Sequence, residues 1–239
     1  MHFNSFKPTI FSVVLWAGVL LRHTTLSAAD RDVQLTQSNA QQTTLVYRLT
    51  DFQLRPLLVN GEAAARPDFA NAVTLNIAGA PELAARVFVF GVPPGARAEV
   101  SVIPGVSEEF SGVNIPPVPI KEKADDLTRL RYAPDAQIYE RAAFYPGDLF
   151  KVEAPAQFRQ QTIVRVQVFP VQYHPVRKQL RIYREMQIVV RFIGSLSAAA
   201  PALATNAPVS LREEELYQNL LVYYEQAKSF RLPAPSPRL

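Results

Sequence analysis

The side chains that could support catalysis in this chain are few. It contains no cysteine and three histidines. His2 and His23 lie in an N-terminal segment that we expect to be removed, which leaves His174. Thiol chemistry is therefore excluded, and a Ser-His-Asp site would have to be built around one histidine. We interpret His174, which precedes Pro175 in a predicted turn, as a surface or capping residue, and we predict that the chain is not an enzyme.

Clustered acidic residues are the remaining candidates for metal binding. Asp125 and Asp126 are adjacent in a charged stretch, and Glu213 to Glu215 follow a predicted helix start. We interpret the first pair as part of a solvated loop and the second group as first-turn acids that the helix dipole favours. The glycines do not form a phosphate-binding pattern, and no calcium-loop spacing is present. The sequence therefore predicts neither a metal site nor a cofactor.

The N-terminus has the pattern of a secretory signal peptide. An apolar run from Thr9 to Leu21 follows Lys7, and small residues at Ser27 to Ala29 offer a cleavage site. We predict a signal peptide over residues 1–29, cleaved between Ala29 and Asp30. The apolar run is shorter than the roughly 20 residues that a membrane span needs. The mature chain is therefore expected to be secreted, periplasmic or on the cell surface, and not in a membrane.

Charge gives no indication of nucleic-acid binding. The chain has 25 basic and 21 acidic residues, and the basic residues form no long patch. A nucleic-acid-binding domain normally carries a clustered basic surface. The charge balance therefore gives no reason to expect a nucleic-acid partner.

Alternating apolar residues predict strands across residues 43–194, after a polar, mobile lead-in at 30–42. Leu45, Tyr47 and Leu49 share one face of a two-residue period. Residues 86–92 are apolar on both faces, as in a strand buried between two layers, and Pro93 to Gly95 should turn them into a second strand at 98–103, forming a hairpin. Residues 61–68, rich in alanine, are expected to form a loop.

The densest strand pattern lies between residues 144 and 193. After a turn at Tyr145 to Asp148, alternate apolar residues share a face in 162–168 and again in 186–192. We expect consecutive strands of an antiparallel sheet. Short strands with frequent proline and glycine between them indicate an all-β fold, an antiparallel β-sandwich with one C-terminal α-helix.

The segments around this sandwich are predicted from composition. Residues 110–131 combine a proline-rich stretch with charged residues and should form a long, exposed connection. Residues 195–209, rich in Ala, Ser and Pro, are expected to be a linker. A capping box from Ser210 to Glu213 predicts a helix over 210–229, docked through Leu216, Leu220 and Tyr224, before a flexible tail at 230–239.

Several of these stretches together resemble one family. They are Phe144 to Asp148, Thr162 to Tyr183 and Met186 to Phe192, with Gly79 to Leu83 and Glu215 to Glu225 adding to the similarity. The chain resembles the N-terminal prodomain of the gingipain-type cysteine peptidases. In that family an aromatic-Pro-Gly-acidic turn precedes a strand, a Pro-x-Gln-Tyr-x-Pro corner and a Leu-Arg-Ile-Tyr strand. No peptidase domain follows within this sequence.

The resemblance implies a β-sandwich propeptide that acts as folding helper and latency inhibitor of a cysteine peptidase catalytic domain. That partner would act in cis in a longer frame or in trans, since the sequence ends near the point where the prodomain of the family gives way to the enzyme. Members that prefer basic residues have an acidic primary pocket. Lys121 and Lys123, with Arg129 and Arg131 behind them, are therefore the candidates for filling it.

Two other classes of protein are consistent with the predicted strands. A cell-surface binding or adhesion sandwich would bind glycan or matrix rather than a peptidase. A hydrolase without cysteine, working with a single histidine, is the least favoured reading. The presence of a gingipain-type catalytic domain in the neighbouring reading frame would separate these classes.

Overall fold

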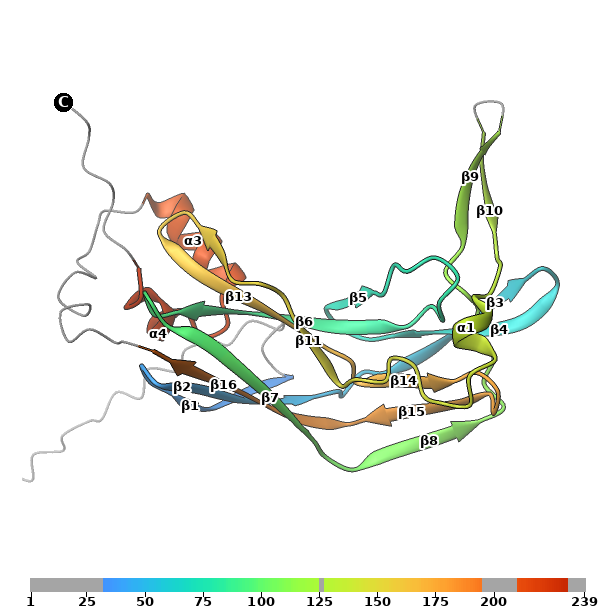
Figure 1. Cartoon of the computed structure of the whole chain (residues 1–239), viewed down its shortest axis with the longest axis horizontal. Coiled ribbons are helices and arrows are strands. Elements are labelled where there is room, and N and C mark those ends of the chain that lie inside the picture. Colours follow the sequence, from blue (N-terminus) through green and yellow to red (C-terminus); the bar gives the residue numbers. More distant parts are fainter. Residues whose placement is uncertain (1–31, 125–126, 195–209, 232–239) are drawn as a thin grey trace, which may run out of the picture.

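The computed structural model describes residues 32–124, 127–194 and 210–231 (Figure 1). The predicted signal peptide with its cleavage site at Ala29 and Asp30, the linker 195–209 and residues 232–239 of the predicted tail lie outside the described residues. The first two residues of the predicted tail 230–239 belong to the folded part, because Phe230 is buried and Arg231 donates a hydrogen bond to Glu214. Within the described ranges, strands dominate and no helix is long and apolar enough to cross a membrane.

The first layer of the fold is built on one long ladder of two strands. Tyr183 pairs with Ser107 and Met186 with Pro104, so the ladder keeps one register across a short break. The inner strand is β15 (Gln179–Tyr183) followed by β16 (Glu185–Ile193), and the outer strand is β7 (Arg97–Pro104) followed by β8 (Ser107–Ser111). On the other side of the inner strand, β2 (Gln42–Arg48) pairs with β16, β14 (Val171–His174) pairs with β15, and β1 (Val33–Ser38) pairs with β2.

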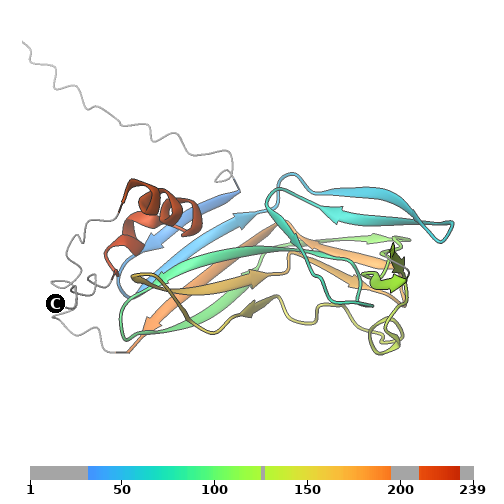
Figure 2. The ribbon, with the colours of Figure 1, turned by 90° about the horizontal axis from the view of Figure 1, so that it is seen from above.

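The second layer is a sheet centred on two paired strands. Strand β13 (Gln161–Val168) pairs with β6 (Ala84–Val92) in antiparallel register, and β6 is largely buried on both faces. The sheet is completed by β5 (Ala72–Thr74) beside β6, and by β11 (Phe150–Val152) and β12 (Ala156–Phe158) beside β13. Figures 1 and 2 show this sheet stacked on the long ladder. The predicted antiparallel β-sandwich is therefore confirmed.

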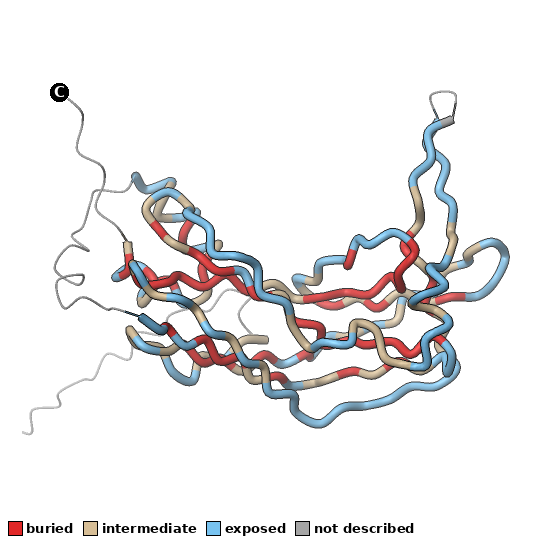
Figure 3. Tube along the Cα trace, in the orientation of Figure 1, coloured by how far each residue is buried: buried red, intermediate tan, exposed pale blue. Residues whose placement is uncertain are grey.

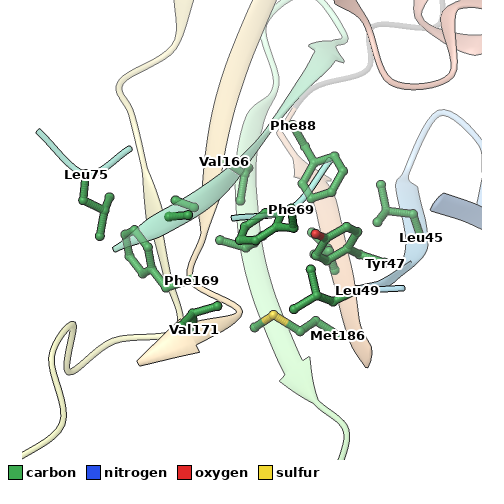
Figure 4. Close-up of a cluster of buried hydrophobic side chains, with 14 of the residues drawn as sticks. Leu45, Tyr47, Leu49, Phe69, Leu75, Phe88, Val166, Phe169, Val171 and Met186 are labelled. Carbon is green, nitrogen blue, oxygen red and sulfur yellow. The ribbon is translucent and has the colours of Figure 1, made fainter. Parts of the chain in front are cut away.

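The core lies between these two layers (Figures 3 and 4). The alternation predicted for the strands is confirmed, because each strand sends every second side chain into the core. Those side chains are Leu45, Tyr47 and Leu49 from the β2 region, Met186, Ile188, Val190 and Phe192 from β16, Val164, Val166 and Val168 from β13, and Phe88, Phe90 and Val92 from β6. The ring of Tyr47 meets the edge of Phe88 at 5.6 Å between centroids.

The pairing of the strands corrects two expectations. Strands β6 and β7 do not form a hairpin, because the turn at Pro93 to Gly95 carries the chain from the second layer to the first. The strands between residues 162 and 193 are likewise not consecutive in one sheet: β13 lies in the second layer, while β14, β15 and β16 lie in the first. Turn residues mark where a strand ends, but the partner of the next strand depends on tertiary packing.

Two further segments form strands where none was expected. Residues 33–38 of the predicted lead-in form β1, an edge strand with one exposed face, and residues 62–68 of the predicted loop form β4 (Glu62–Asp68), paired with β3 (Gln53–Val59). The turn between β3 and β4 consists of Asn60 and Gly61, both with positive φ. Asn-Gly between strands is the strongest short hairpin signal, so residues 60 and 61 indicate this hairpin in the sequence itself, against the expected loop.

Residues 210–231 fold as a C-terminal clasp over the outer face of β6 and β13. The clasp contains helices α3 (Leu211–Leu220) and α4 (Tyr224–Lys228), so the expected single helix is broken at residues 221–223. There the N–H of Val222 donates to the carbonyl of Val89 at 2.8 Å, which covers the free edge of β6. The capping box of Ser210 and Glu213 is confirmed.

The face by which the clasp docks differs in part from the predicted one. Tyr217, Leu221, Tyr224 and Ala227 are buried against the outer side chains of the second layer, with Leu220 partly buried beside them. Leu216, in contrast, is 43% exposed, so its predicted docking role is wrong. The break after Leu220 rotates the next helical turn relative to α3. A buried face assigned on the assumption of one continuous helix therefore does not match the residues that are buried.

A network of charged and aromatic groups closes the clasp. The guanidinium of Arg231 lies over the rings of Tyr217 and Tyr224 and donates to the carboxylate of Glu214 at 3.2 Å. Lys228 donates to the same carboxylate at 3.0 Å. A hydrogen bond from the Tyr224 hydroxyl, with support from Lys228 and Arg231, lowers the pKa of Glu214 to about 2.

The clasp is therefore expected to weaken in acid. Because the folded pKa of Glu214 lies below its ordinary value of 4.5, its stabilisation is complete above about pH 4.5 and is lost as the pH falls towards 2. Between about pH 6 and about pH 3, the free energy of unfolding of the wild-type chain should fall by on the order of 2 kcal/mol, as measured by thermal unfolding. The fall should be smaller in Glu214→Gln, which lacks the titrating carboxylate. An equal loss in both proteins would assign the acid sensitivity to other groups.

Candidate functional site

The predicted basic residues lie on a hairpin that projects from one end of the sandwich (Figure 1). Strand β9 (Ile120–Ala124) pairs with β10 (Leu127–Arg131), and no other strand pairs with either of them in the described part of the chain. The expectation that residues 110–131 form an exposed connection is correct for this hairpin only, because Phe110 belongs to β8 and Ile115 and Val118 are buried. The exposed part is a paired hairpin and not an irregular loop. Five residues per strand give it a reach of roughly 16 Å, at about 3.3 Å per residue.

The register of the hairpin separates the four candidates onto two faces. Lys121 is opposite Leu130 and Lys123 is opposite Thr128, so the two lysines share one face. Glu122 is opposite Arg129, and this pair lies on the other face with Arg131. The structure therefore brings the two lysines together on one face and the two arginines together on the other.

Charge distinguishes these two faces. The guanidinium of Arg131 donates to the carboxylate of Glu122 at 2.6 Å, which partly neutralises the arginine face. No ion pair links Lys121 or Lys123 to another described residue. Leu130, opposite Lys121, is 52% exposed, and Leu127 is 64% exposed. An isolated hairpin with exposed leucines and unneutralised lysines has the composition of a contact surface.

Gly79 holds the two ends of the hairpin together. Its N–H donates to the carbonyl of Val118, which precedes β9, and its carbonyl accepts from the N–H of Asp135, which follows β10, both at 2.9 Å. Gly79 has φ of +80°, and a Cβ at this position would lie 3.2 Å from the carbonyl oxygen of Ala133. The residue therefore supplies both the conformation and the space that this connection requires.

The segment that leads into β9 is anchored in the core. Ile115 and Val118 are buried, and the hydroxyl groups of Tyr139 and Tyr173 donate to the carbonyls of Ile115 and Val113 at 3.0 and 3.1 Å. Burial raises the pKa of both tyrosines, so both hydroxyls stay protonated donors. Tyr139 ends α1 (Ala136–Tyr139), which begins directly after the hairpin with Asp135 as its N-cap. The hairpin thus projects from a rigid base.

Replacing Gly79 with alanine should loosen this base without unfolding the sandwich. The positive φ of Gly79 disfavours any residue with a side chain, and the added Cβ would crowd Ala133 and Asp135, which follow β10. We expect a loss on the order of 1–2 kcal/mol in stability, with faster hydrogen exchange at Val118 and Asp135. Exchange measured by mass spectrometry should stay unchanged in β13 and β16. Uniform acceleration across the chain would mean that Gly79 supports the whole fold instead.

His174 occupies a different position from the expected surface turn. It ends β14 and is 3% exposed, with its ring edge-on to Phe144 at 5.3 Å between centroids. Its Nδ1 accepts from the N–H of Arg177 at 3.4 Å, so the predicted capping contact is present although the exposure was wrong. Neither contact supplies a nucleophile. Among the described residues, no group of three His, Asp or Glu side chains could hold a metal ion.

Comparison with known proteins decides the family. The model of the family Propeptide_C25 matches residues 23–210. The chain belongs to this family. The resemblance seen in residues 144–192 is thereby confirmed, and the match is to a propeptide domain rather than to the catalytic domain of a peptidase.

Two proteins of Porphyromonas gingivalis illustrate the similarity. Lys-gingipain HG66 is 26% identical over 218 residues, which cover 87% of this chain. Gingipain R2 is 23% identical over 224 residues, which cover 92% of this chain. The aligned regions represent 12% and 30% of the lengths of those two proteins.

Solved structures share the fold of this Propeptide_C25 domain. One is the complex of the pro- and mature domains of Porphyromonas gingivalis RgpB, with a TM-score of 0.65, 22% identity, and coverage of 82% of this chain and 99% of that chain. Another comes from work on the zymogenic latency of gingipain K, with a TM-score of 0.59, 25% identity, and coverage of 68% and 93%.

Proposed function

We propose that this propeptide domain binds the catalytic domain of a gingipain-type cysteine peptidase, assists its folding and holds it latent. The partner is part of the same longer chain or a separate protein. Support comes from the family match, and from the solved complex in which a related pro-domain accompanies its mature domain. The observation that carries the proposal is the β9–β10 hairpin, which presents basic side chains away from the body on a fixed base.

The hairpin acts by entering the substrate cleft of the peptidase. A rigid hairpin loses little conformational freedom on binding, because Gly79 and the two tyrosine hydroxyls already hold its ends. A lysine ammonium in a desolvated acidic pocket forms charge-assisted hydrogen bonds to the pocket carboxylate. Because Arg131 is paired with Glu122, the lysine face is the one that contacts the peptidase, and Lys121 or Lys123 enters its acidic pocket.

Mixing experiments test this proposal directly. The purified chain should form a stable complex with a gingipain-type catalytic domain on size-exclusion chromatography and reduce its turnover of a lysine substrate. It should also raise the yield of active peptidase when present during refolding. A glycan or matrix ligand bound in place of the peptidase would favour a cell-surface adhesion sandwich.

Export through the predicted signal peptide completes the proposal. The short apolar run and the small residues at Ser27 to Ala29 favour cleavage before Asp30. N-terminal sequencing of the exported protein should begin at Asp30. Recovery of the chain with Met1 in the membrane fraction would contradict this prediction.

A further inference from the structure

One face of the β3–β4 hairpin consists entirely of apolar side chains. Residues opposite each other in an antiparallel pair lie on the same face, and successive residues of each strand alternate between the two faces. The register therefore gathers three apolar pairs on one face, which we call the apolar face: Leu54 opposite Pro67, Pro56 opposite Ala65 and Leu58 opposite Ala63. Every charged residue of the two strands lies on the opposite face.

The apolar face is open to solvent towards the turn of the hairpin. Leu58 is 75% exposed, and Pro56 and Ala63 are exposed beside it. The opposite face is tied to the body of the domain, where Arg66 pairs at 2.8 Å with Glu82, a residue that is 9% exposed. An exposed strand normally turns its polar side chains to water, so apolar side chains gathered on the outer face indicate a contact surface.

This hairpin shares its base with the β9–β10 hairpin. The N–H of Ala65 donates to the carbonyl of Asn114 at 2.8 Å, and the side-chain amide of Asn114 donates to the carbonyl of Ala63 at 3.0 Å. Asn114 belongs to the anchored segment that leads through Ile115 and Val118 into β9. Figures 1 and 2 show the two hairpins at the same end of the molecule. A partner that contacts one hairpin therefore lies close to the other.

We propose that the apolar face of the β3–β4 hairpin contacts an apolar patch of the peptidase catalytic domain, outside its substrate cleft, while the β9–β10 hairpin enters the cleft. This inference rests on the proposed function. A domain of about 150 residues is roughly 40 Å across, whereas the two hairpins reach roughly 23 and 16 Å. A catalytic domain seated on β9–β10 is therefore wide enough to cover the apolar face as well.

The size of the apolar face argues against a second copy of this chain as its occupant. Three cross-strand pairs extend over roughly 17 Å and two strands over roughly 10 Å, so the face offers at most about 200 Å². A stable dimer buries about 800 Å² per partner. Strand addition at the outer edge of β3 cannot supply the difference, because Pro56 lacks an N–H at an outward position. The apolar face therefore serves as one part of a wider contact.

The substitution Leu58→Gln tests this contact, with Leu211→Gln as its matched control. Leu211 is 89% exposed at the start of α3, in the clasp at the opposite end of the molecule (Figure 1). Leu58→Gln should raise the dissociation constant for a gingipain-type catalytic domain on the order of tenfold, because burial of one leucine side chain contributes about that factor. Leu211→Gln should leave the constant unchanged in the same surface plasmon resonance measurement. Both variants should keep the wild-type melting temperature, because both side chains are exposed.

Sedimentation velocity of the chain alone tests the alternative occupant. Because the apolar face is too small for a stable dimer, the chain should not self-associate through it. A dimer that dissociates in Leu58→Gln but not in Leu211→Gln would assign the face to a second copy and overturn the proposal.

A double-mutant cycle separates this contact from the one inside the cleft. Contacts that share no partner contribute additively, so Leu58→Gln should raise the dissociation constant by the same factor in the variant that carries Lys121→Ala and Lys123→Ala. Absence of any complex with the wild-type chain would overturn the proposed function and this inference together. A wild-type complex that Leu58→Gln does not weaken would overturn this inference alone.

Discussion

The double substitution of Lys121 and Lys123 with alanine should weaken inhibition of a gingipain-type catalytic domain by at least about 30-fold. Removing one partner of a buried, hydrogen-bonded charge pair costs about 2–5 kcal/mol, largely because the remaining carboxylate is left without a partner. The measurement is the inhibition constant with a lysine substrate. Single substitutions will show which of the two lysines occupies the pocket.

The opposite face of the same hairpin provides the control. Arg129→Ala with Arg131→Ala removes the same charge from the same hairpin, but from β10 and from the face that carries Glu122. We expect the inhibition constant to change by no more than about threefold, since exposed ion pairs contribute little. Both double variants should keep the wild-type melting temperature, because these side chains are exposed. A stronger effect from the arginine pair would assign the inhibitory contact to the other face.

Replacing Gly91 with alanine should destabilise the domain more than any surface change. A Cβ on residue 91 of β6 would lie 2.7 Å from the Cβ of Ala227 in α4 and 3.0 Å from Nε2 of Gln161. The contact with Ala227 cannot be relieved by rotating a flexible side chain, so the clasp must shift and its buried residues become exposed. We expect a loss of about 2–4 kcal/mol in the free energy of unfolding.

A second substitution in the same chain tests the cause of this loss. Ala227→Gly removes the methyl group that the new side chain meets, although glycine in a helix itself costs about 1 kcal/mol. The double variant Gly91→Ala with Ala227→Gly should therefore be more stable than Gly91→Ala alone, as measured by urea unfolding. If the losses of the two single variants simply added in the double variant, the cost of the Gly91→Ala side chain would arise from contacts other than the one with Ala227.

Much of the fold follows from local patterns. The alternation of Leu45 with Tyr47, and of Met186 with Ile188, predicts which face of each strand is buried, because successive side chains of a strand point to opposite faces. The capping box at Ser210 predicts the start of α3, because its hydrogen bonds connect residues three positions apart. The Asn60-Gly61 turn is also a local signal, because both residues tolerate the positive φ that a two-residue hairpin turn requires.

The partners of the strands could not be obtained in this way. Nothing in residues 86–103 indicates that the Pro93 to Gly95 turn connects two layers instead of two neighbouring strands. The ladder shared by β7–β8 and β15–β16 joins residues far apart in the chain, and many strand orders would bury the same side chains. The same applies to the break in the clasp, where Val222 leaves the helix to meet Val89.

For the candidate site, composition predicted that residues 110–131 form a charged, exposed connection, which holds for the β9–β10 hairpin but not for the buried Ile115 and Val118. The resemblance to a family indicated which basic residues of the connection to consider. Which basic residues share a face depended on the pairing of β9 with β10, since a two-stranded register decides which side chains lie together. The sequence by itself determined the class of the fold, the buried faces of its strands and the chemistry available at the hairpin. Only the tertiary structure decided the strand order, the rigid base at Gly79 and the separation of lysines from arginines, because each depends on contacts between residues distant in the chain.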